Sequence, residues 1–437
     1  MSRGFESHTL REREPMSESK RHIRRTVARH GQLPKANPVR QLIALVGIAL
    51  ATVLVAGIGV VGYAVGDLYS AYASDTTDIN GGAEAPAIGE LDNRGFNILL
   101  AGLDVCDWEH QEIMGNRCSD DPADYGEDGL ELETARSDVN MLIHISPQPR
   151  RVTVVSFPRD LKAYIPRCEN EDGTVGGDGV EMINAAYSYG GLECLVDTIE
   201  NLTGQTIDHA ASVTWGGVID ITNVIGGVDV CVSGGIADPE SGAYFSDGMN
   251  TVSGDRALAF LRTRHGVGDG SDIARISNQQ VFMSALVKKL MSEEVLTNWG
   301  TLYNLARVVV ENIEKTPALA DPVYLAQLAL AVKDVPFEDF VFTQYPVFVD
   351  PADENRRIPD EAQAEDLFAK INANVDLAVT AEGPGSVSEE EAATGETPAP
   401  EESTTPEPGA TENPGQLGSN VTGQTAADTR CSAGNLG

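Results

Sequence analysis

Basic residues are scarce in this chain after its first 40 positions. Residues 1–40 hold ten Lys and Arg against four Glu, out of totals of 31 basic and 66 acidic residues in 437. The remaining positions therefore carry 21 basic residues against 62 acidic ones, and the formal net charge is -35. This balance argues against nucleic acid as a partner and against a surface that binds phosphate groups in general. Any anion site must be local, built from a few arginines brought together.

Several motifs of catalytic and metal sites are also missing from the sequence. It has no CxxC or HxxxH spacing, so metal binding by its cysteines is not expected. It has no GxxxxGK[ST] loop, no GxSxG turn and no HExxH helix. These absences argue against a nucleotide P-loop, a serine-hydrolase elbow and a zinc-protease helix. His144 and His209 fall within predicted strands, and we interpret both as core residues.

One long uncharged run stands near the N-terminus. Residues 42–65 are 24 amino acids without a charge, long enough to cross a bilayer core about 30 Å thick. The basic residues lie before this run, which predicts a cytoplasmic N-terminus. A cleaved signal peptide is the alternative, because "AYA" at 71–73 resembles a cleavage site, but the apolar core of a signal is usually about 7–15 residues. We predict a single-pass plasma-membrane protein with an extracytoplasmic body.

The chain divides by composition into five segments. We predict a basic cytoplasmic tail, a transmembrane helix, a polar spacer, a folded catalytic body and a disordered acidic tail rich in Pro, Thr and Glu. Their bounds are 1–40, 41–66, 67–92, 93–378 and 379–437.

All six cysteines follow the uncharged run, in a compartment where disulfides can persist. We favour Cys106 with Cys118, because they bracket one loop, and then Cys168 with Cys194. Whether Cys431 folds back onto Cys231 is left open, since sequence alone does not choose among 15 pairings.

Within the body, apolar runs of strand length alternate with helical patterns. The predicted strands are 96–103, 139–145, 152–157, 209–215 and 228–232, with an edge strand at 339–347. The predicted helices include 183–204, 216–225 and 275–295. This alternation predicts an α/β fold, a three-layer α/β/α sandwich with a central mixed sheet.

Arginine and aspartate gather where predicted strands end or begin. The sites are Asp104 after the first strand, Arg136 and Asp138 before the second, and Arg159 and Asp160 after the third. Ligands in open α/β sheets usually collect at such strand ends. A divalent cation with a diphosphate would suit this mixture, because Mg²⁺ takes one or two carboxylates and arginine forks bind phosphate oxygens. The alternative is a set of ion pairs that tie loops together.

A fourth cluster lies at 261–275, "LRTRHGVGDGSDIAR", which holds Arg262, Arg264, Asp272 and Arg275. Three arginines this close repel one another unless an anion lies between them.

Several motifs together resemble the LytR-CpsA-Psr family. The segments "NILLAGLD", "RSDVNMLIHI", "VTVVSFPRDLKAYIP", "INAAYSYGG" and "SGDRALAFLRTRHGVGDGSDIARISNQQ" occur in the family's order between about 95 and 292. The resemblance implies an enzyme that moves a glycopolymer from a polyprenyl-pyrophosphate carrier onto peptidoglycan, with an apolar groove for the lipid tail. It also implies Mg²⁺ as cofactor.

The resemblance assigns roles to individual residues. Asp104 and Asp138 resemble the Mg²⁺ carboxylates. The residues that resemble the pyrophosphate grip are Arg136, Arg159, Arg262, Arg264 and Arg275, and those that resemble their acidic partners are Asp160 and Asp272. From these we expect Arg159, Arg262, Arg264 and Asp160 to be catalytic, and the general base stays open between Asp138 and Asp160.

Two departures from the family pattern stand out. Asn278 occupies a position that is arginine in many members, and the stretch 106–134 is longer than usual and is predicted to form a lid.

Two other functions remain possible from sequence. One is a lipid-pyrophosphate hydrolase, with water in place of the sugar acceptor. The other is a non-enzymatic regulator that binds anionic wall polymer.

Overall fold

The computed structural model describes residues 76–79, 91–112, 117–126, 129–131, 135–170, 173–394 and 414–436. The chain divides into two units, Met1–Gly62 and Tyr63–Gly437, and every described residue belongs to the second. None of the helices in these ranges is long and apolar enough to cross a membrane. The run at 42–65, on which the predicted transmembrane helix rests, lies outside them.

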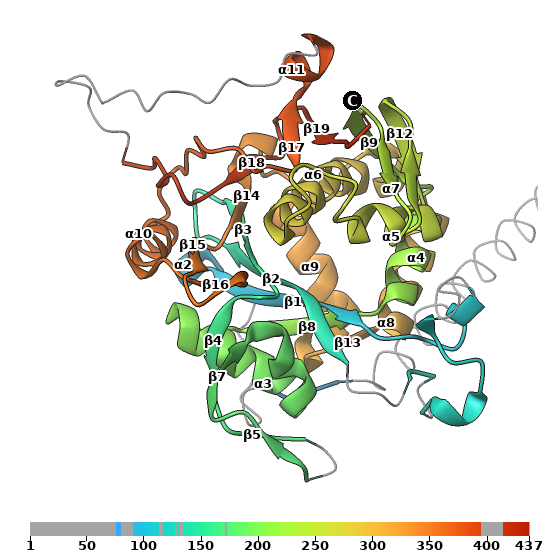
Figure 1. The fold of residues 1–437 in the computed structure, drawn as a ribbon, viewed down its shortest axis with the longest axis vertical. Coiled ribbons are helices and arrows are strands. Elements are labelled where there is room, and N and C mark those ends of the chain that lie inside the picture. The colour runs from blue at the N-terminus through green and yellow to red at the C-terminus, as the bar shows by residue number, and fades with distance from the viewer. Residues whose placement is uncertain are drawn as a thin grey trace, which may run out of the picture. The chain divides into compact units, whose positions relative to one another are not determined.

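A central sheet of seven strands organises the second unit (Figure 1). Its order is β13 (Ile313–Lys315), β8 (His209–Val213), β1 (Phe96–Asp104), β2 (Arg136–Ile145), β3 (Val152–Phe157), β14 (Phe340–Gln344) and β18 (Gly423–Thr425). The pairs β1–β8 and β3–β14 are parallel and the others are antiparallel. The predicted mixed sheet is therefore confirmed.

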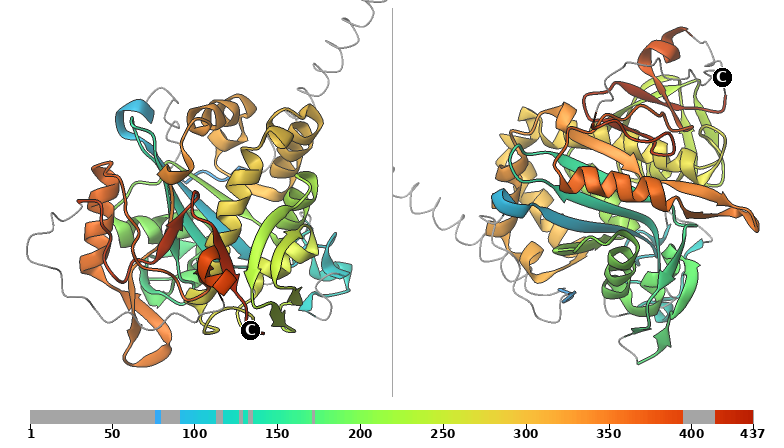
Figure 2. Two further views of the ribbon diagram at one scale, coloured as in Figure 1. Left: turned by 90° about the horizontal axis from the view of Figure 1, so that it is seen from above. Right: turned by 90° about the vertical axis from the view of Figure 1, so that its left-hand side faces the viewer.

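Helices cover both faces of this sheet (Figure 2). Side chains alternate along each strand, so one set, including Leu99 and Leu142, packs with α3 (Ala186–Thr203) and α10 (Glu361–Asn372). The other set, including Met141 and Phe342, packs with α6 (Asp272–Leu290) and α9 (Pro322–Val332). Both faces are buried, which explains the nearly continuous apolar runs in the sequence.

A second sheet lies beside α6. Its order is β12 (Gly248–Val252), β9 (Val228–Ser233), β19 (Arg430–Ala433) and β17 (Ser386–Ser388). The predicted strand at 228–232 thus belongs to this sheet, not to the central one.

The remaining elements are short pairs of strands and connecting helices. The paired strands are β4 (Lys162–Ile165) with β7 (Gly179–Met182), β5 (Cys168–Glu169) with β6 (Val175–Gly176), β10 (Ile236–Asp238) with β11 (Ala243–Phe245), and β15 (Val347–Asp350) with β16 (Asp353–Pro359). The α-helices are α2 (Leu91–Arg94), α4 (Trp215–Val224), α5 (Asp255–Arg262), α7 (Glu293–Leu296), α8 (Trp299–Asn312) and α11 (Glu389–Thr394).

The C-terminal segment differs from the expectation of disorder at 379–437. Residues 379–394 and 414–436 are ordered, whereas 395–413 lie outside the described ranges. In this segment β19 pairs in parallel with β9, and Figure 1 marks the C-terminus beside them. The segment has few apolar residues, so composition predicted no core. Of these, Leu417, Val421 and Ala426 are buried in the cores of the body, and the strands of the segment pair with existing ones.

The C-terminal segment also shows that the predicted edge position of β14 is wrong. The sequence predicted an edge strand at 339–347, but β18 pairs with β14 and makes it internal.

Three disulfides join parts of the fold. The two favoured pairs, Cys106–Cys118 and Cys168–Cys194, are confirmed. The third, Cys231–Cys431, joins β9 to β19 across 200 residues of sequence and closes the question that sequence left open.

Candidate active site

Three antiparallel strands bring distant acidic and basic residues to one edge of the central sheet. β2 runs against both β1 and β3, so the end of β1, the start of β2 and the end of β3 meet. Asp104 is the last residue of β1, Asp138 lies near the start of β2, and Arg159 follows β3 by two residues. Sheet topology alone therefore explains why these three side chains converge.

The segment 261–275 reaches the same edge from the other side. Arg262 ends α5, and Asp272 and Arg275 lie in the first turn of α6. The Ser271 side chain caps α6 by accepting a hydrogen bond from the Ala274 backbone at 3.1 Å. A carboxylate at this helix start is favoured by the helix dipole, which helps to fix Asp272.

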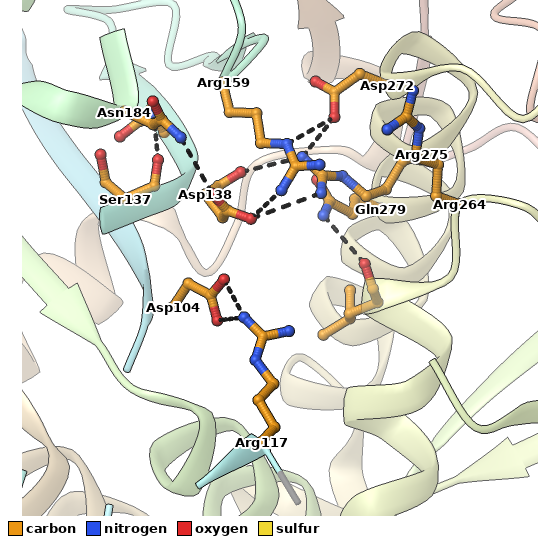
Figure 3. Close-up of polar contacts among 12 residues, drawn as sticks. Asp104, Arg117, Ser137, Asp138, Arg159, Asn184, Arg264, Asp272, Arg275 and Gln279 are labelled. Carbon is orange, nitrogen blue, oxygen red and sulfur yellow. Dashed lines mark hydrogen bonds and ion pairs between the residues drawn. The ribbon is translucent and has the colours of Figure 1, made fainter. Parts of the chain in front are cut away.

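Asp138 and Asp272 lie between the guanidinium groups of Arg159 and Arg275, which the fold brings together from distant parts of the sequence (Figure 3). The guanidinium of Arg159 pairs with Asp138, and its Nε lies 3.5 Å from Asp272 Oδ1. Arg275 Nη2 lies 2.6 Å from the same Asp272 oxygen and also donates to the Asp138 carbonyl at 3.3 Å. Arg275 Nη1 also lies 3.9 Å from Asp138 Oδ2, so each carboxylate contacts both guanidinium groups.

Asp238 holds the loop between α5 and α6. Its Oδ2 accepts from Thr263 Oγ1 at 2.8 Å and from the backbone nitrogens of Arg264 and His265 at 3.1 and 3.2 Å. Burial opposes the charge of Asp238, but the hydrogen bonds from Thr263 and Arg264 lower its pKa overall. Arg264 Nε donates to the Gly270 carbonyl at 3.0 Å, which fixes the guanidinium over the loop.

A cavity of about 370 Å³ lies between the sheet edge and helices α4, α5 and α6. Its polar part is lined by Asp104, Arg117, Asp138, Arg159, Thr214, Asp238, Glu240, Ser241, Arg262, Arg264, His265, Arg275 and Gln279. Its apolar part is lined by Leu100, Leu103, Val139, Met141, Val213, Val218, Leu258, Leu261 and Met283. The cavity thus has a charged region that holds five arginines and an oily region beside it.

Burial and neighbouring charge act on the ionisable groups of this site. Burial raises the pKa of Asp104, and the charge of Asp138 raises it further, although Arg117 acts in the opposite direction. Burial lowers the pKa of Arg262, and the nearby Arg117 adds to this effect. Burial opposes the charge of Arg159, yet Asp138 and Asp272 together raise its pKa. The site therefore holds like charges close together at a cost.

Most of the predicted site residues meet here. Six of them line the cavity: Asp104, Asp138, Arg159, Arg262, Arg264 and Arg275. Asp272 lies behind the wall, where it contacts two of the arginines. Asp160 does not line the cavity, and burial followed by the charge of Asp272 raises its pKa.

Arg136 is the exception among the predicted arginines. It is exposed and is not part of the cavity wall, although it pairs with Asp104 in the strand register. Its predicted role in binding pyrophosphate remains a prediction.

Sequence reasoning did not single out several residues of the cavity wall, among them Arg117, Asp238 and Gln279. Arg117 pairs with Asp104, Asp238 anchors the arginine loop, and Gln279 donates to the Leu261 carbonyl at 3.1 Å. Arg117 lies in the stretch predicted as a lid, where no motif marked it. Asn278, the departure from the family pattern, is buried and donates to the Phe260 carbonyl at 2.7 Å, so it joins α6 to α5.

Asp104 and Asp138 fit one side of a divalent cation site. Their charges are close enough for Asp138 to raise the pKa of Asp104, a repulsion that a cation between them would relieve. Mg²⁺ needs only one or two carboxylates where phosphate oxygens and waters complete its shell. In the part of the chain that the structure describes, no group of three or more His, Cys, Asp and Glu side chains could hold a metal unaided.

A sequence model of the LytR_cpsA_psr family matches residues 63–369, about 70% of the chain. The chain belongs to this family. The match contains every cavity residue named above.

Two relatives show how much of the chain the sequence similarity covers. The cell wall biosynthesis protein LcpA of Corynebacterium glutamicum is 30% identical over 286 residues, which are 61% of this chain and 53% of LcpA. The polyisoprenyl-teichoic acid–peptidoglycan teichoic acid transferase TagU of Enterococcus faecalis is 28% identical over 204 residues, which are 47% of this chain and 56% of TagU. The chain thus spans about half the length of each relative.

The fold is also similar to a solved structure. Protein gbs0355 from Streptococcus agalactiae matches with a TM-score of 0.51 at 19% identity, covering 66% of this chain and 91% of that one. This likeness concerns the fold alone.

Proposed function

We propose that this protein transfers a glycopolymer from a polyprenyl-diphosphate carrier to a hydroxyl group of peptidoglycan. The observation that carries the proposal is the single cavity with five arginines at one part and an apolar lining at the other. A polyprenyl diphosphate has the matching two parts, an anionic head and a long hydrocarbon tail. Membership of the family and the names of LcpA and TagU support the same class of reaction.

The arginines suit the head group for a physical reason. A guanidinium binds phosphate oxygens through two parallel N–H groups, and its charge persists when it is buried. Arg159 and Arg275 are already oriented by Asp138 and Asp272, so little rearrangement is needed on binding. Donors fixed in advance stabilise charge that develops on a leaving group.

The proposed reaction is a phosphoryl transfer. The acceptor hydroxyl oxygen forms a bond to the phosphorus that carries the glycopolymer, and the bond from that phosphorus to the oxygen of polyprenyl phosphate breaks. The hydroxyl proton passes to a carboxylate, and the candidates are Asp138, which lines the cavity but would also hold the cation, and Asp160, which lies outside the cavity wall.

Mg²⁺ is part of this proposal. Asp104 and Asp138 would hold it, and when bound it would offset charge on the diphosphate oxygens. The proposed location is the outer face of the plasma membrane, with the N-terminus in the cytoplasm and residues 42–65 as the anchor, as the pattern of basic residues predicts.

The test uses the purified full chain in detergent with a polyprenyl-diphosphate-linked glycan, with and without peptidoglycan fragments. Transfer predicts glycan-bearing fragments and polyprenyl phosphate only when fragments are present. Release of phosphorylated glycan at the same rate without fragments would instead identify a hydrolase. If cells with Asp104→Ala plus Asp138→Ala keep full function in wall assembly, the protein is a binding regulator and the proposal is wrong.

A further inference from the structure

The long connection between β1 and β2 is fastened at its base. Cys106 and Cys118 are joined by a disulfide. The Glu131 backbone nitrogen donates to the Cys106 carbonyl at 2.9 Å, and the Trp108 nitrogen donates to the Gly129 carbonyl at 2.8 Å. The connection therefore has a closed base at the mouth of the cavity.

A second set of contacts fixes this connection to α4. Asp107 Oδ2 accepts from the Gly216 backbone nitrogen at 3.1 Å, and Asp107 Oδ1 lies 2.6 Å from His110 Nδ1. His110 Nε2 lies 3.6 Å from Asp220 Oδ1 on the same helix. Gly216 allows this close approach, because a Cβ there would lie 2.5 Å from His110 Nδ1. The residue next to Cys118 is thereby directed toward the cavity.

That residue is Arg117, and it has two partners. Its Nη2 pairs with both carboxylate oxygens of Asp104 (Figure 3). Its guanidinium carbon lies 4.6 Å from the ring centre of Trp215, while that of Arg262 lies 4.5 Å from the same ring. The Arg117 side chain is 46% exposed, so it is free to change partners in a way that the buried Arg275 is not.

The two guanidinium groups beside Trp215 can together attract an anion. Arg117 and Arg262 contact the same ring, that of Trp215. Burial is the largest cause of the lowered pKa of Arg262, and the charge of Arg117 lowers it further. Two guanidinium groups this close repel one another, and an anion between them removes the repulsion. The tryptophan holds both guanidiniums by cation–π contact whether or not the anion is present.

On the basis of the proposed function, we propose that Arg117 is a further diphosphate-binding residue and that Asp104 is its counterion when the cavity is empty. The carboxylate exchanges Arg117 for a divalent cation, and Arg117 then binds phosphate oxygens beside Arg262. This connection thus supplies a substrate-binding arginine from outside the sheet edge.

The first test is cation binding without lipid, measured by titrating Mn²⁺ into the full chain in detergent and recording its electron paramagnetic resonance signal. Arg117→Gln removes the competing cation, so the Kd for Mn²⁺ should fall about tenfold, the scale of one charge-assisted hydrogen bond. Arg262→Gln removes a nearby charge that acts on Asp104 less strongly than Arg117 does, and it should lower the Kd less. An unchanged or higher Kd in Arg117→Gln would overturn the exchange at Asp104.

The second test is binding of a synthetic polyprenyl diphosphate to the same proteins in the presence of Mn²⁺. Arg117→Gln should raise the Kd for the lipid about tenfold, and Arg117→Lys should lie between, since lysine keeps the charge without the fork. If Arg117 only held the fold, Arg117→Gln would raise the Kd for both Mn²⁺ and the lipid. Changes of opposite sign in the two Kd values therefore distinguish a direct role from a structural one. Unchanged lipid affinity would overturn the phosphate role. Because neither measurement needs the acceptor, failure of transfer itself remains a separate outcome.

Discussion

The ionisable side chains on strands β1, β2 and β8 are charged at one end of these strands and neutral at the other. At the cavity end, Asp104 and Asp138 face several arginines and form ion pairs. At the other end, His144 and His209 are buried, and burial lowers the pKa of each to about 4, so both are neutral near pH 7.

Different neighbours explain this contrast. His209 Nε2 lies 2.6 Å from the Tyr324 hydroxyl, and its ring meets Phe96 edge-on. His144 Nδ1 lies 2.8 Å from Asn97 Oδ1. These direct partners are neutral, and the charge of the nearby Asp208 only partly offsets the effect of burial on the two histidines. A buried group keeps its charge only where opposite charges or hydrogen bonds offset the loss of water, as the ion pairs do at the cavity end.

The largest expected effect comes from breaking the buried pair at the cavity end. Arg275→Met leaves Asp272, which is 3% exposed, without its nearest cation. We expect the free energy of unfolding to fall by roughly 3–5 kcal/mol, as when one partner of a buried pair is removed. Chemical unfolding of the full chain measures this. The double variant Asp272→Asn with Arg275→Met should recover most of the stability; no recovery would show that the pair is not what holds the loop.

The next effect is on the reaction rate. Arg159→Ala removes a half-buried guanidinium that lines the cavity and pairs with Asp138. Transfer should slow by about 10²- to 10³-fold, as when one preorganised charge-stabilising donor is lost. The initial rate with donor and peptidoglycan fragments measures this effect. Lys333→Ala, which breaks an exposed ion pair with Asp334, is the control and should keep the wild-type rate.

The histidine end predicts a dependence of stability on pH. Both histidines bind protons more weakly in the folded protein, so stability falls as pH drops from 6.5 toward 4. Between pH 6.5 and 5 the loss is about 2 kcal/mol per histidine. Unfolding at both pH values measures it, and His209→Gln should flatten the profile.

The smallest expected effect is on the acid limit of cation binding, the pH below which the protein no longer binds Mn²⁺. Asp104 must be ionised to bind a cation, and burial raises its pKa, so Mn²⁺ binding should weaken at a pH above the usual range of an aspartate. Arg117 lowers that pKa, so in Arg117→Gln the loss should begin at a still higher pH. Mn²⁺ titrations at a series of pH values measure the shift. A limit that moves to lower pH would contradict the role given to Arg117.

The convergence of Asp104, Asp138 and Arg159 was predictable from the sequence because it follows from strand order, while their roles stay predictions. Asp104, Asp138 and Arg159 stand at the ends of strongly apolar strands, and neighbouring strands must bring those ends together. Apolar runs can be recognised in a short stretch of sequence, and the central sheet contains most of the strands that they predicted.

Residues placed by long-range contacts escaped prediction. Arg117 lies in an acidic stretch without a motif, and only the disulfide and the contacts with α4 direct it to Asp104. The ordered residues 414–436 have a polar composition that predicts disorder, but pairing of β19 with β9 and the Cys231–Cys431 bond hold them. Neither cause is visible in local sequence.

A crystal structure of the full chain with a synthetic polyprenyl diphosphate tests the central claim most directly. The account predicts the diphosphate between Arg159, Arg262 and Arg275, with the hydrocarbon chain along the apolar lining that includes Met141 and Met283. A lipid bound elsewhere, while the arginines keep only their carboxylate partners, would contradict it.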